Sequence, residues 1–260
     1  MAQRESYKQG VPSWVDLTTD NLEASKAFYR HVLGWDYTEV SFGAATYTMA
    51  TLGGKRVAGL MQQSEEQIEH GPPPRWNTYL AVDDVSGVSE AVSGLGGQLL
   101  MPPVELADAG TMAAIADRSG TLVGLWQANS HTGAEVVNEP GALIWNELVT
   151  DDVTAAASFF SDLVGWTTAE IETSTGPYTL FSIDGESAGG ISQKLYDHIQ
   201  THWETYFNVS SIDDMLGIVG ETDGLIDEPT DIGFGRVAAV RDPQGAVFHV
   251  METTTSEQPH

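Results

Sequence analysis

Two acidic residues stand two positions after a tryptophan at corresponding places in the chain. Asp16 follows Trp14, and Glu147 follows Trp145. Because side chains alternate between the faces of a strand, each carboxylate shares a face with its tryptophan. A carboxylate beside an indole in a cleft can hydrogen-bond a ligand or act as a general base. The same pattern also fits a carboxylate held by backbone amides in a core, so both interpretations stay open.

A pair of histidines offers a second candidate site. His198 and His202 are four residues apart, which on a helix would direct both rings to one side and toward a metal. The segment around them instead reads as a loop between two units, so we expect solvated side chains. His202 nevertheless lies on the same strand face as Glu204.

Composition excludes several classes of function. The 260 residues include 37 acidic and 11 basic side chains, a formal charge of −26, and no cysteine. Such a charge repels phosphate backbones and anionic membranes, so we expect neither nucleic acid nor membrane as a partner. Disulfides and thiolate sites are impossible. We predict a cytoplasmic protein, a monomer or a homodimer, with a small molecule as its partner.

The chain repeats itself after about half its length. Trp14–Leu17 recurs 131 positions later as Trp145–Leu148, and Gly34-Trp35 recurs as Gly165-Trp166. Toward the end the offset is 125, as expected for small loop deletions. An internal repeat of this length predicts two homologous domains. We place them at residues 11–128 and 142–252, joined by a polar linker at 129–141.

Each copy reads as two βαβββ units. In the first unit we expect a strand at 14–18, a helix from 22 to 33 with Asp20 as N-cap, and strands at 35–40, 45–52 and 57–61. The second unit has a strand at 76–82, a helix at 85–95 and strands at 98–101, 111–116 and 122–126. The fold class is therefore α+β.

Several motifs resemble the vicinal oxygen chelate superfamily, which includes glyoxalase I, bleomycin-resistance proteins and extradiol dioxygenases. They are the opening strand Trp14–Leu17, the helix end at 28–35, the junction at 82–85 and the Asp-Pro-x-Gly turn at 242–245. The segment 124–127 is typical of a two-domain actinobacterial glyoxalase-like subgroup. The resemblance implies two tandem domains, each with a half-open sheet around a cleft.

The resemblance also implies where metal ligands would stand, namely on the first and last strands of the two units. In domain 1 these positions are Trp14, Asn77 and Gly124, which are not usual metal ligands. In domain 2 they are Trp145, Glu204 and His249, of which two are good ligands. Gln193 on the fourth strand is a further residue that can reach the cleft.

Three roles remain open for Glu204 and His249: a metal pair, a metal-free acid–base pair, or a structural couple. The cofactor is accordingly either none or a single divalent metal in domain 2. Each unit also begins with a tryptophan, and an aromatic ring there can stack on a planar ligand or pack in the core. These residues are Trp14, Trp76, Trp145 and Trp203.

The leading functional hypothesis is lyase- or isomerase-type chemistry on a small carbonyl or aromatic metabolite in the domain 2 cleft. Glu204 would be the base or metal ligand, His249 its acid or co-ligand, and Glu147 would assist. Trp145 and Trp203 would wall the substrate, with Trp14, Asp16, Trp76 and Asn77 as ligand-binding positions in domain 1. The alternative is a protein that only binds an antibiotic or biosynthetic intermediate. A metal-dependent dioxygenase is the third possibility.

Overall fold

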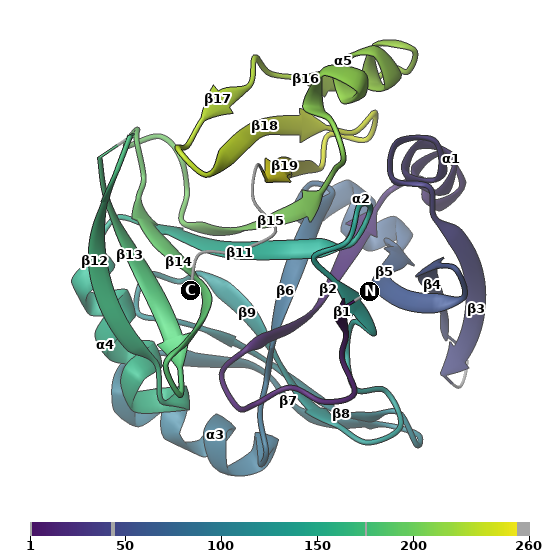
Figure 1. Ribbon diagram of the computed structural model, residues 1–260. Coiled ribbons are helices and arrows are strands. Elements are labelled where there is room, and N and C mark those ends of the chain that lie inside the picture. Colours follow the sequence, from purple (N-terminus) through teal and green to yellow (C-terminus); the bar gives the residue numbers. More distant parts are fainter. Residues whose placement is uncertain (1, 43–44, 175, 254–260) are drawn as a thin grey trace.

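The computed structural model describes residues 2–42, 45–174 and 176–253, and its strands form two large curled sheets (Figure 1). The first sheet takes its strands from residues 12–128, here called the first half, in the order β3-β4-β5-β2-β6-β9-β8-β7. Its strands are β2 (Pro12–Thr19), β3 (Asp36–Phe42), β4 (Ala45–Leu52), β5 (Lys55–Gln62), β6 (Arg75–Ala81), β7 (Gln98–Leu106), β8 (Gly110–Ala116) and β9 (Leu122–Ala128).

The second sheet takes its main strands from residues 136–253, the second half, in the order β12-β13-β14-β11-β15-β19-β18-β16. Three short strands, β1, β10 and β17, join it at the side. Its strands are β1 (Ala2–Gln3), β10 (Val136–Val137), β11 (Leu143–Thr150), β12 (Thr167–Thr173), β13 (Gly176–Ile183), β14 (Glu186–Gln193), β15 (His202–Asn208), β16 (Leu225–Ile226), β17 (Thr230–Asp231), β18 (Gly235–Arg241) and β19 (Val247–Thr253). The expected α+β fold of paired βαβββ units is confirmed.

The two units of each sheet meet along their opening strands, which run antiparallel. In the first half β2 pairs with β6 and places Asp16 opposite Asn77. In the second half β11 pairs with β15 and places Glu147 opposite Glu204. Directly opposed side chains on one face of a sheet lie within contact distance. The topology therefore brings residues of two units together at the centre of each sheet.

Local sequence signals begin and end the helices. Helix α1 (Leu22–Leu33) is capped by the side chain of Asn21, which accepts a hydrogen bond from the amide of Ala24. The prediction of Asp20 as N-cap was wrong by one residue. Gly34 ends the helix in the left-handed region at φ 75°, where its amide bonds to the carbonyl of Arg30. The other helices are α2 (Glu65–His70), α3 (Val85–Val92), which continues as a 3₁₀ turn at Ser93–Leu95, α4 (Val153–Val164) and α5 (Ile212–Gly220).

The hydrophobic core lies between the two halves and is shared by them. Helix α1 of the first half packs with α5 of the second, and α3 packs with α4. One core cluster joins the first βαβββ unit to the last, and another joins the two middle units. The opposite, concave face of each sheet takes no part in this shared core.

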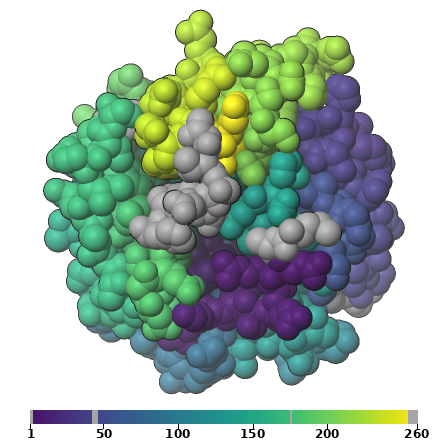
Figure 2. Space-filling model, in the orientation of Figure 1, coloured from purple at the N-terminus to yellow at the C-terminus, as the bar shows by residue number. Residues whose placement is uncertain are grey.

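The segment at 129–141, predicted as a polar linker, contributes buried residues. Its strand β10 pairs with β1 and with β11, and Ala134 is fully buried. The N-terminal residues, purple in Figure 2, lie on the face of the molecule shown there, next to residues of the second half. Among the described residues, no helix is long and apolar enough to cross a membrane.

Candidate acid–base site on the second sheet

Two carboxyl groups face each other on the concave side of the second sheet. Tyr178 on β13 donates a hydrogen bond to Glu147 Oε2 at 2.9 Å. The hydroxyl of Tyr206 on β15 lies 2.8 Å from Glu204 Oε2 and 3.2 Å from Glu147 Oε2. The three strands β13, β11 and β15 thus converge on one hydrogen-bonded group of carboxyls and hydroxyls.

The hydroxyl of Tyr206 has one hydrogen but two carboxyl neighbours. Tyr206 is the donor in both contacts, and because it has one hydrogen the two carboxyl groups compete for it, with Glu204 at the shorter distance. Burial raises the pKa of Glu147 to about 7, and the negative charge of Glu204 adds to the shift. Glu147 therefore gains and loses its proton near neutral pH.

Glu204 has the opposite tendency. Burial opposes its ionisation, but a hydrogen bond from His202 and the nearby His249 outweigh burial and hold its pKa below the ordinary range. His202 Nε2 lies 3.3 Å from Glu204 Oε1, and His249 Nδ1 lies 3.7 Å from Oε2. Two adjacent carboxyl groups therefore differ in protonation, as paired acid and base groups do in active sites.

His249 lies against the ring of Tyr206. The two rings stack with centroids 4.6 Å apart and an interplanar angle of 20°. Burial lowers the pKa of His249, and its Nδ1 has no hydrogen-bond partner among the described residues. Burial thus disfavours the charged form of the imidazole, and the negative charge of Glu204 opposes that effect.

Trp145 and a glycine position the second tyrosine. The indole of Trp145 donates to the hydroxyl of Tyr178 at 2.9 Å. A Cβ at Gly190 would overlap that hydroxyl. Glycine at 190 is therefore needed for the ring of Tyr178 to lie over β14 and reach Glu147.

The first sheet carries the same frame with a different electrostatic outcome. Asp16 accepts hydrogen bonds from Tyr47 at 3.1 Å, Tyr79 at 3.0 Å and the amide of Asn77 at 2.9 Å. Burial raises the pKa of Asp16 as well, against the opposing effect of these three hydrogen bonds, but no second carboxylate faces it. An amide stands where the second half has Glu204.

The closing strands differ as well. Gly124 is the first-half counterpart of His249, and a Cβ there would overlap the ring of Tyr79. Trp14 and Asp16 are 5% and 3% exposed, so these predicted ligand-binding positions are covered. The first half is not an open copy of the second.

Two predicted ligand-wall residues lie on the wrong face. Trp76 is buried in the shared core, where its indole donates to Tyr29 at 3.1 Å. Trp203 is buried against Phe160 and Trp166. Each tryptophan directly precedes a residue of the concave face, so strand alternation sends its ring to the core.

Gln193 was also misplaced by the sequence analysis. Its amide donates to the backbone carbonyl of Asp151 at 3.1 Å, at the start of α4. Gln62 makes the equivalent contact with Asp20 in the first half. Both glutamines brace a strand-to-helix turn and lie outside the concave face.

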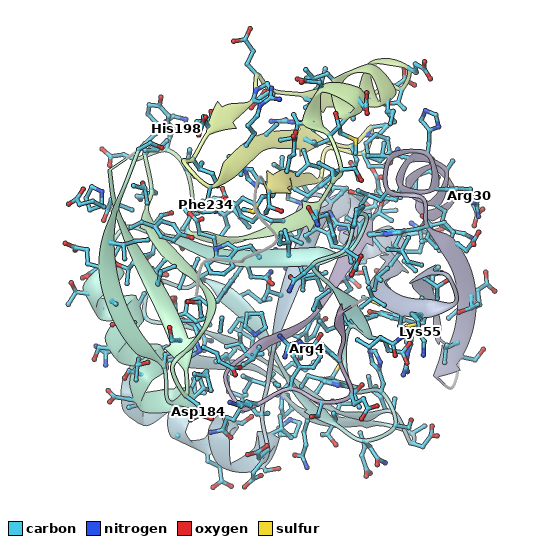
Figure 3. All side chains as sticks on the ribbon, viewed as in Figure 1. Arg4, Arg30, Lys55, Asp184, His198 and Phe234 are labelled. Atoms are coloured by element: carbon cyan, nitrogen blue, oxygen red, sulfur yellow. The ribbon has the colours of Figure 1, made fainter. Side chains whose placement is uncertain are left out.

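His198 and His202 do not form a common site, as expected for residues that are not on one helix. His198 lies at the outer edge of the molecule (Figure 3) and stacks on Tyr196. His202 begins β15 and contacts Glu204, on whose strand face the sequence analysis placed it.

Sequence reasoning also missed Tyr178, Tyr206 and Ser192, whose side chain hydrogen-bonds to Glu147. Tyr178 repeats Tyr47, and Tyr206 shares strand parity with Glu204. Parity and repeat together could have identified both tyrosines.

The donor set does not fit a metal centre. The opening positions hold Trp14 and Trp145, and an indole N–H can donate but cannot ligate. Gly124 offers no donor. Within residues 2–42, 45–174 and 176–253, no group of three or more histidine, aspartate or glutamate side chains could hold a metal ion.

Comparisons with known proteins agree with this architecture. Residues 12–148 match the family model of the Glyoxalase/Bleomycin resistance protein/Dioxygenase superfamily. The "Putative glyoxylase CFP32" of Mycobacterium tuberculosis is 42% identical over 97% of this chain and 98% of its own length. The anthracycline biosynthesis protein DnrV of Streptomyces peucetius is 32% identical over 95% of this chain and 94% of its own length.

Two solved structures show the same fold at low identity. The 2,3-dioxygenase LapB from Pseudomonas sp. KL28 superposes with a TM-score of 0.66 at 16% identity, covering 97% of this chain and 96% of LapB. The Mn(II)-bound glyoxalase from Novosphingobium aromaticivorans gives 0.62 at 17% identity, covering 96% and 86%. Because the family model matches residues 12–148 and a relative is 42% identical over nearly the whole chain, the chain belongs to the Glyoxalase/Bleomycin resistance protein/Dioxygenase superfamily.

Proposed function

We propose that the second half performs lyase- or isomerase-type acid–base chemistry on a small carbonyl or aromatic metabolite. The observation that carries this proposal is the single hydroxyl of Tyr206 between the carboxyl groups of Glu147 and Glu204. It keeps one proton beside an ionised carboxylate. General acid–base catalysis is most effective when the pKa of the group lies near the working pH, and the pKa of Glu147 is raised to about 7.

The pKa directions reverse the roles expected from sequence. Glu147, not Glu204, is the group that gains and loses a proton near neutral pH. In its ionised form it takes a proton from the hydroxyl-bearing carbon next to a substrate carbonyl, which leaves an enediolate, and the acid so formed can exchange its hydrogen with solvent. It then gives a proton to the former carbonyl carbon, while a proton moves from the hydroxyl oxygen to the carbonyl oxygen. Glu204 stays ionised, and the ring of His249, stacked on Tyr206, holds that tyrosine in place.

Proton exchange at carbon tests the proposal without knowledge of the natural substrate. Hydroxyacetone and dihydroxyacetone are incubated with the protein in D₂O, and loss of the α-proton signal is followed by NMR. We expect exchange above the buffer rate that rises with pH through about 7, as Glu147 ionises. Glu147→Gln should reduce the rate about 100-fold, within the range typical of a lost general base.

The first half supplies a matched control. Asp16→Asn changes the equivalent carboxylate on the other sheet and should leave exchange intact. Equal loss in both variants, or a rate that does not change between pH 6 and 8, would contradict the assignment of Glu147.

A second candidate is binding without turnover. Relatives named for anthracycline biosynthesis favour an aromatic ligand, and the indole of Trp145 is partly exposed on the concave face. In that case an anthracycline titrated into the protein should bind less tightly to Trp145→Leu than to Trp14→Leu. Glu147→Gln should then leave its affinity unchanged.

A further inference from the structure

The concave face of the first half keeps the aromatic frame of a ligand site. Trp14 donates to the hydroxyl of Tyr47 at 2.9 Å, as Trp145 donates to Tyr178 at 2.9 Å in the second half. In both halves the tyrosine then donates to the central carboxylate. The frame is therefore intact in the half that lacks the acid–base pair.

The occupant of this face is a side chain from the segment between the halves. The ring of His131 meets Trp14 edge-on, with centroids 4.4 Å apart and an interplanar angle of 87°. It also lies 5.5 Å from the ring of Trp126. Ala134 and Val137 close the same cluster around Trp14. His131 is 6% exposed, so its ring fills an enclosed aromatic pocket.

The pocket does not satisfy the polar atoms of this ring. Neither Nδ1 nor Nε2 of His131 has a hydrogen-bond partner among the described residues. Burial lowers the pKa of His131 to about 4, and the positive charge of Arg56 lowers it further, against the opposing effect of Glu135. The ring is neutral, and both of its buried nitrogens lack a hydrogen-bond partner among the described side chains and backbone, which is unfavourable for a polar group.

The surrounding backbone is held independently of the ring. The amide of Ala134 bonds to the carbonyl of Ser13 at 2.8 Å, and Glu135 forms an ion pair with Arg56 at 3.1 Å. The backbone next to His131 thus has anchors that do not involve the imidazole ring.

We propose that the concave face of the first half is a binding site for an apolar aromatic ring of about benzene's size, with His131 as a displaceable occupant. A ring without polar atoms keeps the contacts with Trp14 and Trp126 and buries no unpaired nitrogen, so it suits the pocket better than imidazole. This site is separate from the acid–base site and does not depend on the function proposed for it.

Fluorobenzene is a suitable probe, because its ¹⁹F signal reports binding directly. His131→Gly removes the occupant and leaves an apolar cavity, which stays dry and accepts small aromatic molecules. We expect one equivalent of fluorobenzene to bind this variant about tenfold more tightly than the wild-type protein. His131→Phe fills the pocket permanently and should abolish the gain.

Two indole variants locate the bound probe. In the His131→Gly background, Trp14→Leu should remove the added binding, whereas Trp145→Leu should leave it unchanged. A folded His131→Gly protein that binds no more fluorobenzene than wild type would overturn the proposal, as would a gain that is lost only with Trp145→Leu.

A measurement on the wild-type protein covers the case in which His131→Gly does not fold. With ¹³C-labelled histidine, excess fluorobenzene should move the ring signals of His131 toward those of a solvated histidine. Unchanged His131 signals at saturating probe would also overturn the proposal.

Discussion

Tyr29 links two buried polar groups where the first βαβββ unit meets the last. Its hydroxyl accepts a hydrogen bond from the indole of Trp76 at 3.1 Å and donates to Asp242 Oδ2 at 3.0 Å. All three side chains are buried. One hydroxyl therefore satisfies a donor and an acceptor at once.

The junction of the two middle units lacks that hydroxyl. Phe160 stands where the repeat has Tyr29, and the equivalent partners, Trp203 Nε1 and Asp117 Oδ2, are buried without hydrogen-bond partners among the described residues. The rings of Phe160 and Trp203 are 6.0 Å apart at 78°, close to the 5.4 Å and 88° of Tyr29 and Trp76. A tyrosine at 160 is therefore positioned to make both bonds.

The expected gain follows from the two bonds. A hydrogen bond to a charged carboxylate contributes about 1.5–3 kcal/mol and an ordinary one about 1 kcal/mol. Fitting an extra atom into a packed core opposes this, by about 1–3 kcal/mol where no space exists. We expect Phe160→Tyr to raise the free energy of unfolding by about 1–3 kcal/mol.

Urea denaturation, followed by tryptophan fluorescence and circular dichroism, measures the change. The reciprocal variant Tyr29→Phe leaves two groups unpaired and should lower the free energy of unfolding by a similar amount. A Phe160→Tyr protein no more stable than wild type, alongside a clearly destabilised Tyr29→Phe protein, would refute the idea that the missing hydroxyl leaves this junction unsatisfied.

Three further predictions concern the site and the segment between the halves. Because the folded-state pKa of Glu147 is raised from 4.5 to about 7, the wild-type protein should lose roughly 3 kcal/mol of stability as pH rises through that window. Glu147→Gln should flatten this part of the pH–stability curve, and an unchanged slope would argue against the raised pKa. In Gly190→Ala the new methyl group forces Tyr178 away from Glu147. We expect the free energy of unfolding, measured by thermal denaturation, to fall by about 1–3 kcal/mol and most of the α-proton exchange to be lost. Retained exchange would show that Tyr178 is dispensable. Arg56→Gln removes the half-buried ion pair with Glu135 and should lower the free energy of unfolding by about 1 kcal/mol. Hydrogen–deuterium exchange followed by mass spectrometry should show faster amide exchange at 134–137. Unchanged exchange there would show that the ion pair does not hold the segment.

The sequence by itself determined the architecture of this protein. The repeat, in which Gly34-Trp35 recurs as Gly165-Trp166, predicts two copies of a paired βαβββ scheme, and in the structure both glycines end equivalent helices. Strand alternation places Glu147 on the face of Trp145, the resemblance places Trp145 and Glu204 in one cleft, and β11 pairs with β15 so that Glu147 and Glu204 lie opposite each other. These features follow from local rules of side-chain direction and capping, which a single sequence carries.

Only the tertiary structure decided what each carboxylate does and which face is open. The protonation difference between Glu147 and Glu204 depends on Tyr206, His202 and burial by strands from separate units, so no local pattern encodes it. The closure of the first half depends on His131, more than 100 residues after Trp14 in the chain but 4.4 Å from it in space. Contacts between distant segments decide how far each carboxyl group is buried and which side chain covers each concave face. For that reason the two halves differ in their chemistry although they share one aromatic frame.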